Sequence, residues 1–204
     1  MSDKYGISVV NNKWTKTAFQ QWLVDYPSWD YFITLNPEIA QYKNTRYLSP
    51  DFIQKSASFV KQWHAHMDKQ LLGKHWHKKD PVNERTFLVA LPEIGSKGDL
   101  LHWHGILRVP NVRNKCRFTK IATNAFYTAW LASFGGSGKY VKRHNRYYET
   151  DNYGEVLPLP VDKKEKMGHL YIAPYERGSA FYSTKLFCSD LGMKHYIIST
   201  EFSQ

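Results

Sequence analysis

Short segments dominated by apolar and β-branched residues alternate along the chain with segments of helical spacing. "WDYFITLNP" (residues 29–37) is rich in aromatic and β-branched residues and ends at Asn-Pro, which predicts a strand closed by a turn. Residues 85–94 and 100–109 predict two more strands, and the "GSKGD" between them indicates a tight turn. The two strands therefore predict a β-hairpin.

Helical periodicity is clearest between residues 49 and 73. Ser49 is a suitable N-cap, Pro50 suits the first turn, and Gly73 suits the C-cap. Residues 119–136 predict a second helix and residues 178–192 a short third helix. One face of the first helix is expected to carry, with the small Ser56, the apolar residues Phe52, Phe59, Val60, Trp63, Met67 and Leu71.

Residues 167–175 and 194–200 predict the remaining strands. With the elements in the order β-α-β-β-α-β-α-β, the expected fold class is α+β, a central antiparallel sheet of about five strands whose flanking helices lie on one face. Neither a repeat nor a domain boundary is evident, so residues 1–204 are expected to form a single domain. Residues 137–166 are basic and rich in tyrosine and turn residues, and we expect an inserted strand with a long mobile loop.

The charge balance narrows the classes of partner. Lys and Arg total 28 against 18 Asp and Glu, which gives a net charge of +10 and a pI of about 9.5. Aromatic residues make up 16% of the chain. Lys and Arg side chains can bind phosphates, and aromatic rings can stack on bases. This composition therefore suits a nucleic-acid partner. A solvated basic surface, or one that meets an anionic membrane, is the alternative.

Cysteine use and hydropathy exclude other classes. The two cysteines, Cys116 and Cys188, stand far apart in sequence, so neither a disulfide framework nor a zinc-thiolate site is indicated. The opening "MSDKYGISVV" lacks the apolar core of a signal peptide, and no apolar run reaches membrane-spanning length. We therefore expect an intracellular protein with no membrane partner.

The chain contains three His-x-His pairs, and their predicted contexts differ. On a strand, residues two apart project from one face, so His102 and His104 in "LLHWHGIL" would present two imidazoles to one metal ion, with Trp103 on the core side. The hairpin turn would bring Glu93 back beside them. Two imidazoles and one carboxylate suit Mg²⁺ or Mn²⁺ acting on a phosphate.

The other two pairs are poorer candidates. His64 and His66 lie on the first predicted helix, where residues two apart point about 200° away from each other. His75 and His77 lie among lysines in "GKHWHKKD", and neighbouring cations repel a metal ion. We interpret this pair as part of a basic loop suited to contact with phosphate. For all three pairs a purely structural role is the alternative.

The segment "FYSTKLF" places Tyr182 and Lys185 three residues apart on the third predicted helix, and therefore on one helical face. A tyrosine hydroxyl alone is a poor nucleophile. A nearby metal ion or ammonium group favours the phenolate and stabilises the negative charge on the phosphate that it attacks. With 14 tyrosines in the chain, a chance Tyr-x-x-Lys that serves only in packing is the alternative.

Three motifs follow one another in order: "FITLN" in an early strand, Glu93 with "HWHGIL" on the hairpin, and "YSTK" on the late helix. In this order and spacing the chain resembles the HUH endonuclease superfamily, specifically the rolling-circle replication initiators that carry a single catalytic tyrosine. The resemblance extends from Trp29 to about Phe187, most of the chain. It implies the nicking-domain fold of that superfamily, a central antiparallel sheet with flanking helices.

The resemblance also implies a role for each residue of the second and third motifs. It assigns His102, His104 and Glu93 to a divalent metal, Mg²⁺ or Mn²⁺. It makes Tyr182 the nucleophile and Lys185 its helper.

The implied substrate is single-stranded or hairpin origin DNA, whose scissile phosphate the tyrosine attacks in line. The products are a 5′-phosphotyrosine link and a free 3′-hydroxyl that primes replication, in a bacterial cytoplasm or a host nucleus. Thr34 and Asn36, with Phe32 in the same motif, are expected to lie against the bound DNA. Tyr175 is a second tyrosine near the last motif, but "YERG" lacks the matching lysine.

The segment "KYVKRHNRYY" (residues 139–148) mixes cations with tyrosines inside the expected insertion at 137–166. We expect it to contact single-stranded DNA or an origin hairpin, and a solvated basic loop is the alternative. The cations concerned are Lys139, Lys142, Arg143 and Arg146.

A nucleotide-binding loop does not accompany these motifs, because "SFGGSGKY" has Ser133 where the pattern requires its first glycine and Tyr140 after the lysine. The chain is therefore either a nicking domain cut from a longer protein or one that uses a separate or host helicase. A single-tyrosine transposase or a relaxase would share the same chemistry. A nuclease that uses water, and a nucleic-acid-binding module without catalysis, are the alternatives of other classes.

Overall fold

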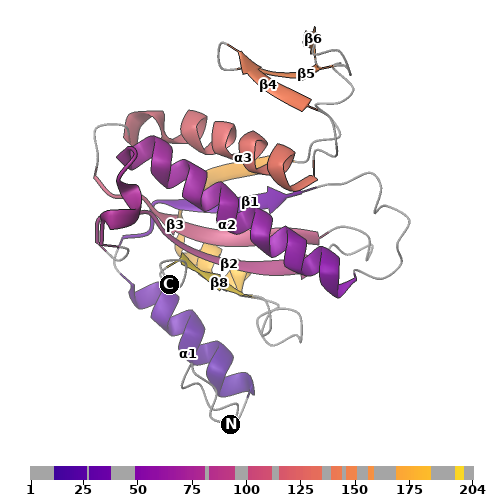
Figure 1. The fold of residues 1–204 in the computed structure, drawn as a ribbon. Coiled ribbons are helices and arrows are strands. Elements are labelled where there is room, and N and C mark those ends of the chain that lie inside the picture. The colour runs from indigo at the N-terminus through magenta and orange to yellow at the C-terminus, as the bar shows by residue number, and fades with distance from the viewer. Residues whose placement is uncertain are drawn as a thin grey trace.

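The centre of the fold is an antiparallel sheet with the strand order β7-β1-β3-β2-β8 (Figure 1). Its five strands are β1 (Tyr31–Asn36), β2 (Phe87–Ile94), β3 (Leu101–Arg108), β7 (His169–Pro174) and β8 (Ile197–Ile198). The computed structural model describes residues 12–26, 28–37, 49–80, 83–94, 101–111, 115–134, 139–143, 146–150, 156–158, 169–184 and 196–199. The predicted α+β class and the predicted hairpin of β2 and β3 are confirmed, and the "GSKGD" turn lies outside the described residues.

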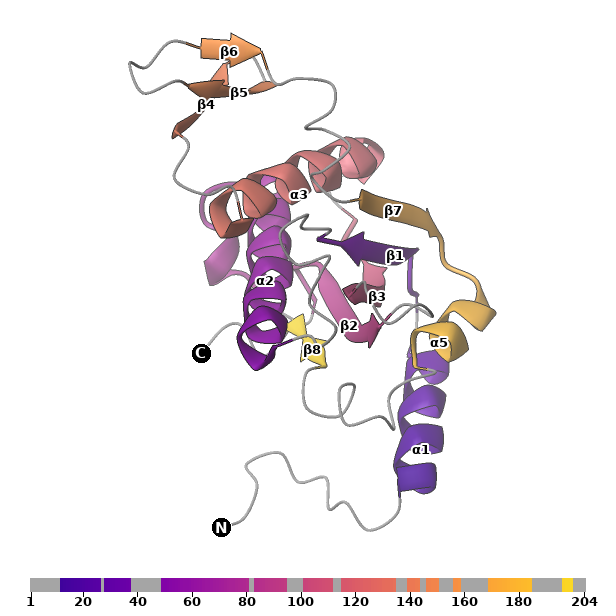
Figure 2. The same ribbon diagram turned by 90° about the vertical axis from the view of Figure 1, so that its right-hand side faces the viewer.

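Helices cover both faces of this sheet. Those in the described part of the chain are α1 (Asn12–Asp25), α2 (Pro50–Leu72), α3 (Phe118–Phe134) and α5 (Arg177–Ser183), with short 3₁₀ turns η2 (Trp76–Lys78) and η3 (Lys115–Arg117). Figure 2 shows α2 and α3 on one side of the sheet and α1 and α5 on the other. The expectation of helices on one face is therefore wrong. The physical reason lies in β2, whose first six residues are all buried, so that both faces of the sheet need a cover.

Helix α2 begins and ends where the sequence predicts. The Ser49 hydroxyl accepts a hydrogen bond from the Phe52 backbone N–H at 3.2 Å. At the other end Gly73 has a φ of 86°, and its N–H donates to the Lys69 carbonyl. The face predicted from the helical spacing is buried in full: Phe52, Ser56, Phe59, Val60, Trp63, Met67 and Leu71.

Two apolar cores lie on the two faces of the sheet. On the α2 and α3 side, the buried indole of Trp103 donates to Ser56 Oγ at 2.6 Å, and the indole of Trp63 donates to the Ala122 carbonyl. The core on the α1 and α5 side is smaller. It contains Leu23, Trp29, Phe87, Val89, Leu91, Ile106 and Ala180. Alternate residues of β3 therefore face different cores, and His102 and His104 share the smaller side with Ile106.

Helix α1 is an element that the sequence analysis did not predict. Its only fully buried apolar side chain among the described residues is Leu23, while Phe19 and Val24 pack partly against the smaller core. Such a narrow apolar stripe gives little periodic signal. No helix in the described ranges combines the length and apolar character needed to cross a bilayer.

The segment expected to be an inserted loop contains a second sheet. Strands β4 (Lys139–Arg143), β5 (Arg146–Thr150) and β6 (Val156–Pro158) pair antiparallel in that order, separately from the five-stranded sheet (Figure 1). The expectation of one strand with a long loop is therefore wrong for the described parts of residues 137–166. The predicted contacts of Lys139, Lys142, Arg143 and Arg146 with DNA stay predictions.

Candidate active site

His104 is the central residue of the candidate site, and neighbouring strands hold its ring from two sides. It lies on β3 opposite Thr34 of β1. Its Nδ1 is 2.9 Å from Thr34 Oγ1, and its Nε2 is 2.9 Å from Glu93 Oε2. The side chains of His104 and Glu93 are only 10% and 16% exposed. Both ring nitrogens are thus engaged, which fixes the orientation of the imidazole.

The contact with Thr34 suits either neutral tautomer of His104. With the proton on Nε2, that proton lies on the side of the ring that faces the Glu93 carboxylate, and Nδ1 accepts a hydrogen bond from the Thr34 hydroxyl. With the proton on Nδ1, the ring donates a hydrogen bond to the Thr34 hydroxyl. The lone pair of Nε2 is then free and points to the side where Glu93 lies. Nε2 can therefore carry either a proton or a free lone pair, the form that binds a metal, without a change in the orientation of the ring.

The hairpin places Glu93 beside the histidine pair. Glu93 lies directly opposite His102 in the pairing of β2 with β3, and its carboxylate reaches His104 diagonally. The rings of His102 and His104 lie on the same face, with centroids 6.2 Å apart. The structure therefore places the three residues predicted to bind a metal on one face of the hairpin, with Glu93 and His104 in direct contact.

The chemistry of these donors fits a divalent cation. Two imidazoles and one carboxylate project from one face of adjacent strands, and the Nε2 of His104 already faces an oxygen of Glu93. In the parts of the chain that the structure describes, no group of three or more His, Cys, Asp or Glu side chains is gathered as a finished metal site. Instead Glu93 and His104 contact each other directly. The metal assignment of the three residues stays a prediction.

Tyr182 of α5 lies against the imidazole of His104. The two ring centroids are 5.0 Å apart and the planes meet at 82°. Phe32 of β1 completes the cluster: its ring is nearly parallel to His104 at 5.8 Å and perpendicular to Tyr182 at 5.8 Å. Tyr182 is 47% exposed, so its side chain contacts the buried His104 and remains accessible from solvent.

Helix α5 is held in place at both ends. At its start, Glu176 and Ser179 form a capping box. At its end, the buried Thr184 donates to the Ala180 carbonyl and accepts a 2.7 Å hydrogen bond from Gln20 of α1. Sequence reasoning missed Gln20, because no local pattern links a helix near the N-terminus to a motif 164 residues later. The unpredicted helix α1 thus braces the helix that carries Tyr182.

Tyr175 is a weaker candidate for the nucleophile. Its ring packs partly against the smaller core, and this burial raises the pKa of the Tyr175 phenol, although the Arg177 cation opposes the shift. A raised pKa leaves less phenolate at neutral pH. Lys185 lies outside the described residues, so its predicted role as helper stays a prediction.

The first motif contributes differently to the site than the sequence suggested. Thr34, expected at the DNA, contacts His104 in the structure, and Phe32 packs against both the His104 and the Tyr182 rings. Asn36 ends β1 opposite His169 of β7. The roles of Thr34 and Asn36 at the DNA stay predictions.

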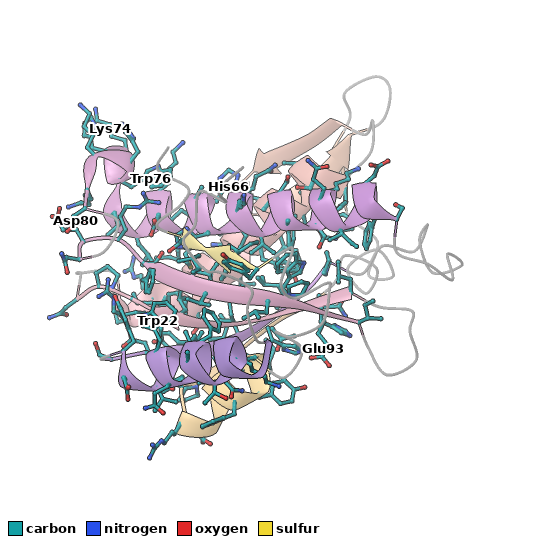
Figure 3. All side chains as sticks on the ribbon, turned by 90° about the horizontal axis from the view of Figure 1, so that it is seen from below. Trp22, His66, Lys74, Trp76, Asp80 and Glu93 are labelled. Atoms are coloured by element: carbon teal, nitrogen blue, oxygen red, sulfur yellow. The ribbon has the colours of Figure 1, made fainter. Side chains whose placement is uncertain are left out.

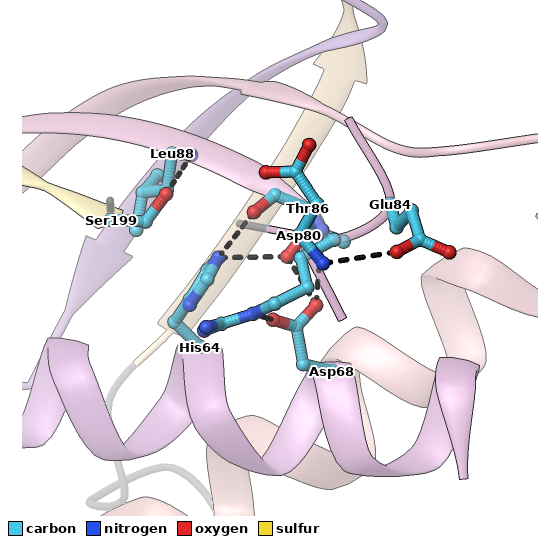
Figure 4. Close-up of polar contacts among 8 residues, drawn as sticks. His64, Asp68, Asp80, Glu84, Thr86, Leu88 and Ser199 are labelled. Carbon is cyan, nitrogen blue, oxygen red and sulfur yellow. Dashed lines mark hydrogen bonds and ion pairs between the residues drawn. The ribbon is translucent and has the colours of Figure 1, made fainter. Parts of the chain in front are cut away.

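The first histidine pair is structural at His64. Its Nε2 donates to the Thr86 hydroxyl at 2.7 Å, and that hydroxyl donates to the Asp68 carboxylate at 2.6 Å (Figure 4). Asp68 also pairs with the guanidinium of Arg85 at 3.0 Å. All four side chains are buried, and this desolvation lowers the pKa of His64 despite the nearby Asp68. The cluster fastens α2 to the start of β2.

The remaining pair lies far from the candidate site. His75 is the N-cap of the short η2 turn, His77 lies within it, and both are exposed. Figure 3 shows Lys74 and Trp76 at the opposite end of the molecule from Glu93. His75 and His77 therefore cannot bind the same metal ion as His104.

Comparison of the chain with protein-family models, with curated proteins and with solved structures gives no match.

Proposed function

We propose that the chain nicks and rejoins single-stranded DNA by phosphodiester transesterification, with Tyr182 as the nucleophile, in the manner of the rolling-circle initiators that it resembles. The observation that carries this proposal is the contact of Tyr182 with His104, whose Nε2 faces Glu93. A half-exposed phenol thus lies beside a shielded imidazole–carboxylate pair. The net charge of +10 supports a polyanionic substrate.

Glu93, His104 and His102 would hold the divalent metal, with Thr34 keeping the proton of His104 on Nδ1. When bound, Mg²⁺ or Mn²⁺ would polarise the scissile phosphate and neutralise the charge that develops on it. The chain's own task is to place the phenol of Tyr182. Phe32 and His104 limit the motion of its ring, and the hydrogen bond from Gln20 to Thr184 holds its helix.

In the nicking step the Tyr182 oxygen forms a bond to phosphorus, and the bond from phosphorus to the 3′-oxygen breaks. The phenol loses its proton and the departing 3′-oxygen gains one, so the products are a 5′-phosphotyrosine and a 3′-hydroxyl. The new phosphodiester retains the energy of the old one. A 3′-hydroxyl can therefore attack it later and rejoin the strand.

The test uses single-stranded DNA oligonucleotides of randomised sequence that carry one dye at the 5′ end and another at the 3′ end. With Mn²⁺ or Mg²⁺, the 3′ dye is expected to migrate with the protein on a denaturing gel, while the 5′ dye appears in a shortened free strand. Tyr182→Phe and His104→Ala are each expected to abolish both bands. Cleavage without a labelled protein would indicate attack by water, and binding without cleavage would indicate a module that only binds DNA; either result overturns the proposal.

A further inference from the structure

Tyr171 is the most exposed large hydrophobic side chain in the described part of the chain, at 59% exposure. It lies in the middle of β7, at the edge of the five-stranded sheet. An exposed aromatic ring on a strand presents a large apolar surface with a polar hydroxyl, and this surface is open to contact with a ligand. The position of Tyr171 relative to the candidate site indicates which ligand contacts its ring.

The strand pairing places Tyr171 on the same face as the site. Tyr171 is directly opposite Thr34 of β1, and Thr34 is directly opposite His104 of β3. Residues directly opposite each other project from one face of a sheet. The neighbours of Tyr171 agree, because Leu170 and Ile172 pack against the core on the other face.

Tyr171, Thr34 and His104 therefore form a row across three adjacent strands. Because strands lie about 4.8 Å apart, the backbone of Tyr171 is roughly 10 Å from that of His104. A DNA strand whose phosphate lies at His104 and Tyr182 would have a neighbouring base within reach of this ring.

We infer that Tyr171 is a stacking platform for one base of the single-stranded DNA that occupies the candidate site. This inference rests on the proposed function and adds a substrate contact to it. An exposed tyrosine offers a flat face to any base, so the contact would contribute affinity without strong sequence preference. The ring would also orient the strand across the sheet.

The experiment measures the dissociation constant of a fluorescent, mixed-sequence single-stranded oligonucleotide in EDTA, where metal-dependent cleavage cannot interfere. Tyr171→Ala is expected to raise the Kd roughly 5- to 150-fold, which corresponds to the usual contribution of one stacked base. Tyr171→Phe keeps the ring and is expected to bind as wild type does. Tyr171→Leu keeps apolar volume without a π face and is expected to resemble Tyr171→Ala.

Two further readouts separate stacking from other roles. The dependence of log Kd on log salt concentration is expected to keep its slope in Tyr171→Ala, because a stacked ring releases no counterions. A strand with abasic sugars throughout is expected to bind wild type and Tyr171→Ala equally. An altered salt slope, or an equal loss on the abasic strand, would overturn the inference.

The outcomes also distinguish this inference from the proposed function. Unchanged affinity of Tyr171→Ala, in a chain that cleaves DNA through Tyr182, overturns the inference alone. A reduced affinity in a chain that never cleaves supports the platform and overturns the nicking activity. If the wild type does not bind the oligonucleotide in EDTA, the inference fails, and the cleavage assay with Mn²⁺ still decides the proposed function. Because Tyr171 is exposed, each variant is expected to fold, which thermal unfolding verifies.

Discussion

Thr34 Oγ1 lies 2.9 Å from Nδ1 of His104, across the pairing of β1 with β3. This hydrogen bond joins residues 70 positions apart and leaves the other ring nitrogen of His104 facing Glu93. Thr34 is thus a positioning residue for the histidine, and its hydroxyl can stabilise the tautomer that a metal requires.

Replacement of Thr34 by valine is therefore expected to weaken the binding of Mn²⁺. Valine keeps the shape of threonine but removes the partner of Nδ1, and the loss of such an outer partner typically costs about 10- to 100-fold in metal affinity. Titration calorimetry with MnCl₂ measures the effect. Thr34→Ser is the matched control and is expected to bind nearly as wild type does. Equal Mn²⁺ affinity for wild type and Thr34→Val would contradict the role of the hydroxyl.

A side chain at Gly105, directly after His104, is expected to lower the stability of the fold. A Cβ at this position would lie 2.7 Å from the Val89 carbonyl oxygen and 3.2 Å from a side-chain carbon of Ile33. Overpacking of this kind lowers the free energy of unfolding by about 1–3 kcal/mol, which urea denaturation of Gly105→Ala measures. In Gly178→Ala, the control, the new Cβ meets nothing within 4 Å. A Gly105→Ala variant as stable as Gly178→Ala would argue against the close approach of the three central strands.

The ion pair between Asp68 and Arg85 is expected to matter for stability when one partner is removed. Both side chains are almost fully buried, and Asp68 also accepts from the backbone and hydroxyl of Thr86. Asp68→Ala would leave the Arg85 cation buried without its counter-charge, at a cost of about 3–5 kcal/mol in the free energy of unfolding. Asp51→Ala, in the exposed first turn of α2, is the control, with an expected loss of about 0.3–1 kcal/mol. Similar losses for the two variants would contradict the buried network.

His64 is expected to make the protein less stable in mild acid. Burial lowers its pKa in the folded state below the ordinary value of 6.5, so the unfolded chain binds the proton more readily. Stability is therefore full above about pH 6.5 and falls as the pH drops below that value, by up to about 1.4 kcal/mol per pH unit for one proton. Urea unfolding between pH 7.5 and 5 measures the slope. His64→Gln is expected to have a smaller slope, and an unchanged slope would contradict a neutral buried His64.

The local elements could be predicted because their signals are local. The N-cap Ser49, the terminal Gly73 and the spacing of the apolar residues define α2 from its own sequence. The hairpin likewise follows from two adjacent apolar runs, and its pairing sets Glu93 opposite His102. The hairpin alone carries Glu93, His102 and His104, the three residues of the predicted metal site.

The features of the fold and of the site that were not predicted depend on contacts between segments that are distant in sequence. The bond from Thr34 to His104 requires that β1 pair with β3, although α2 and β2 lie between them in sequence. The hydrogen bond from Gln20 to Thr184 requires α1, in which Leu23 is the fully buried apolar side chain among those that the structure describes. The continuous apolar run of β2 did contain a signal for helices on both faces, which the sequence analysis did not use.

The central claim is that Tyr182, beside His104, is the residue that becomes linked to DNA. The most direct measurement is peptide mapping by mass spectrometry after the chain reacts with single-stranded DNA and Mn²⁺, followed by nuclease and protease digestion. The account predicts a 5′-phosphonucleotide attached to the peptide that contains Tyr182, and no such peptide from Tyr182→Phe. A nucleotide on Tyr175 instead, or cleaved DNA with no nucleotide on any peptide, would contradict it.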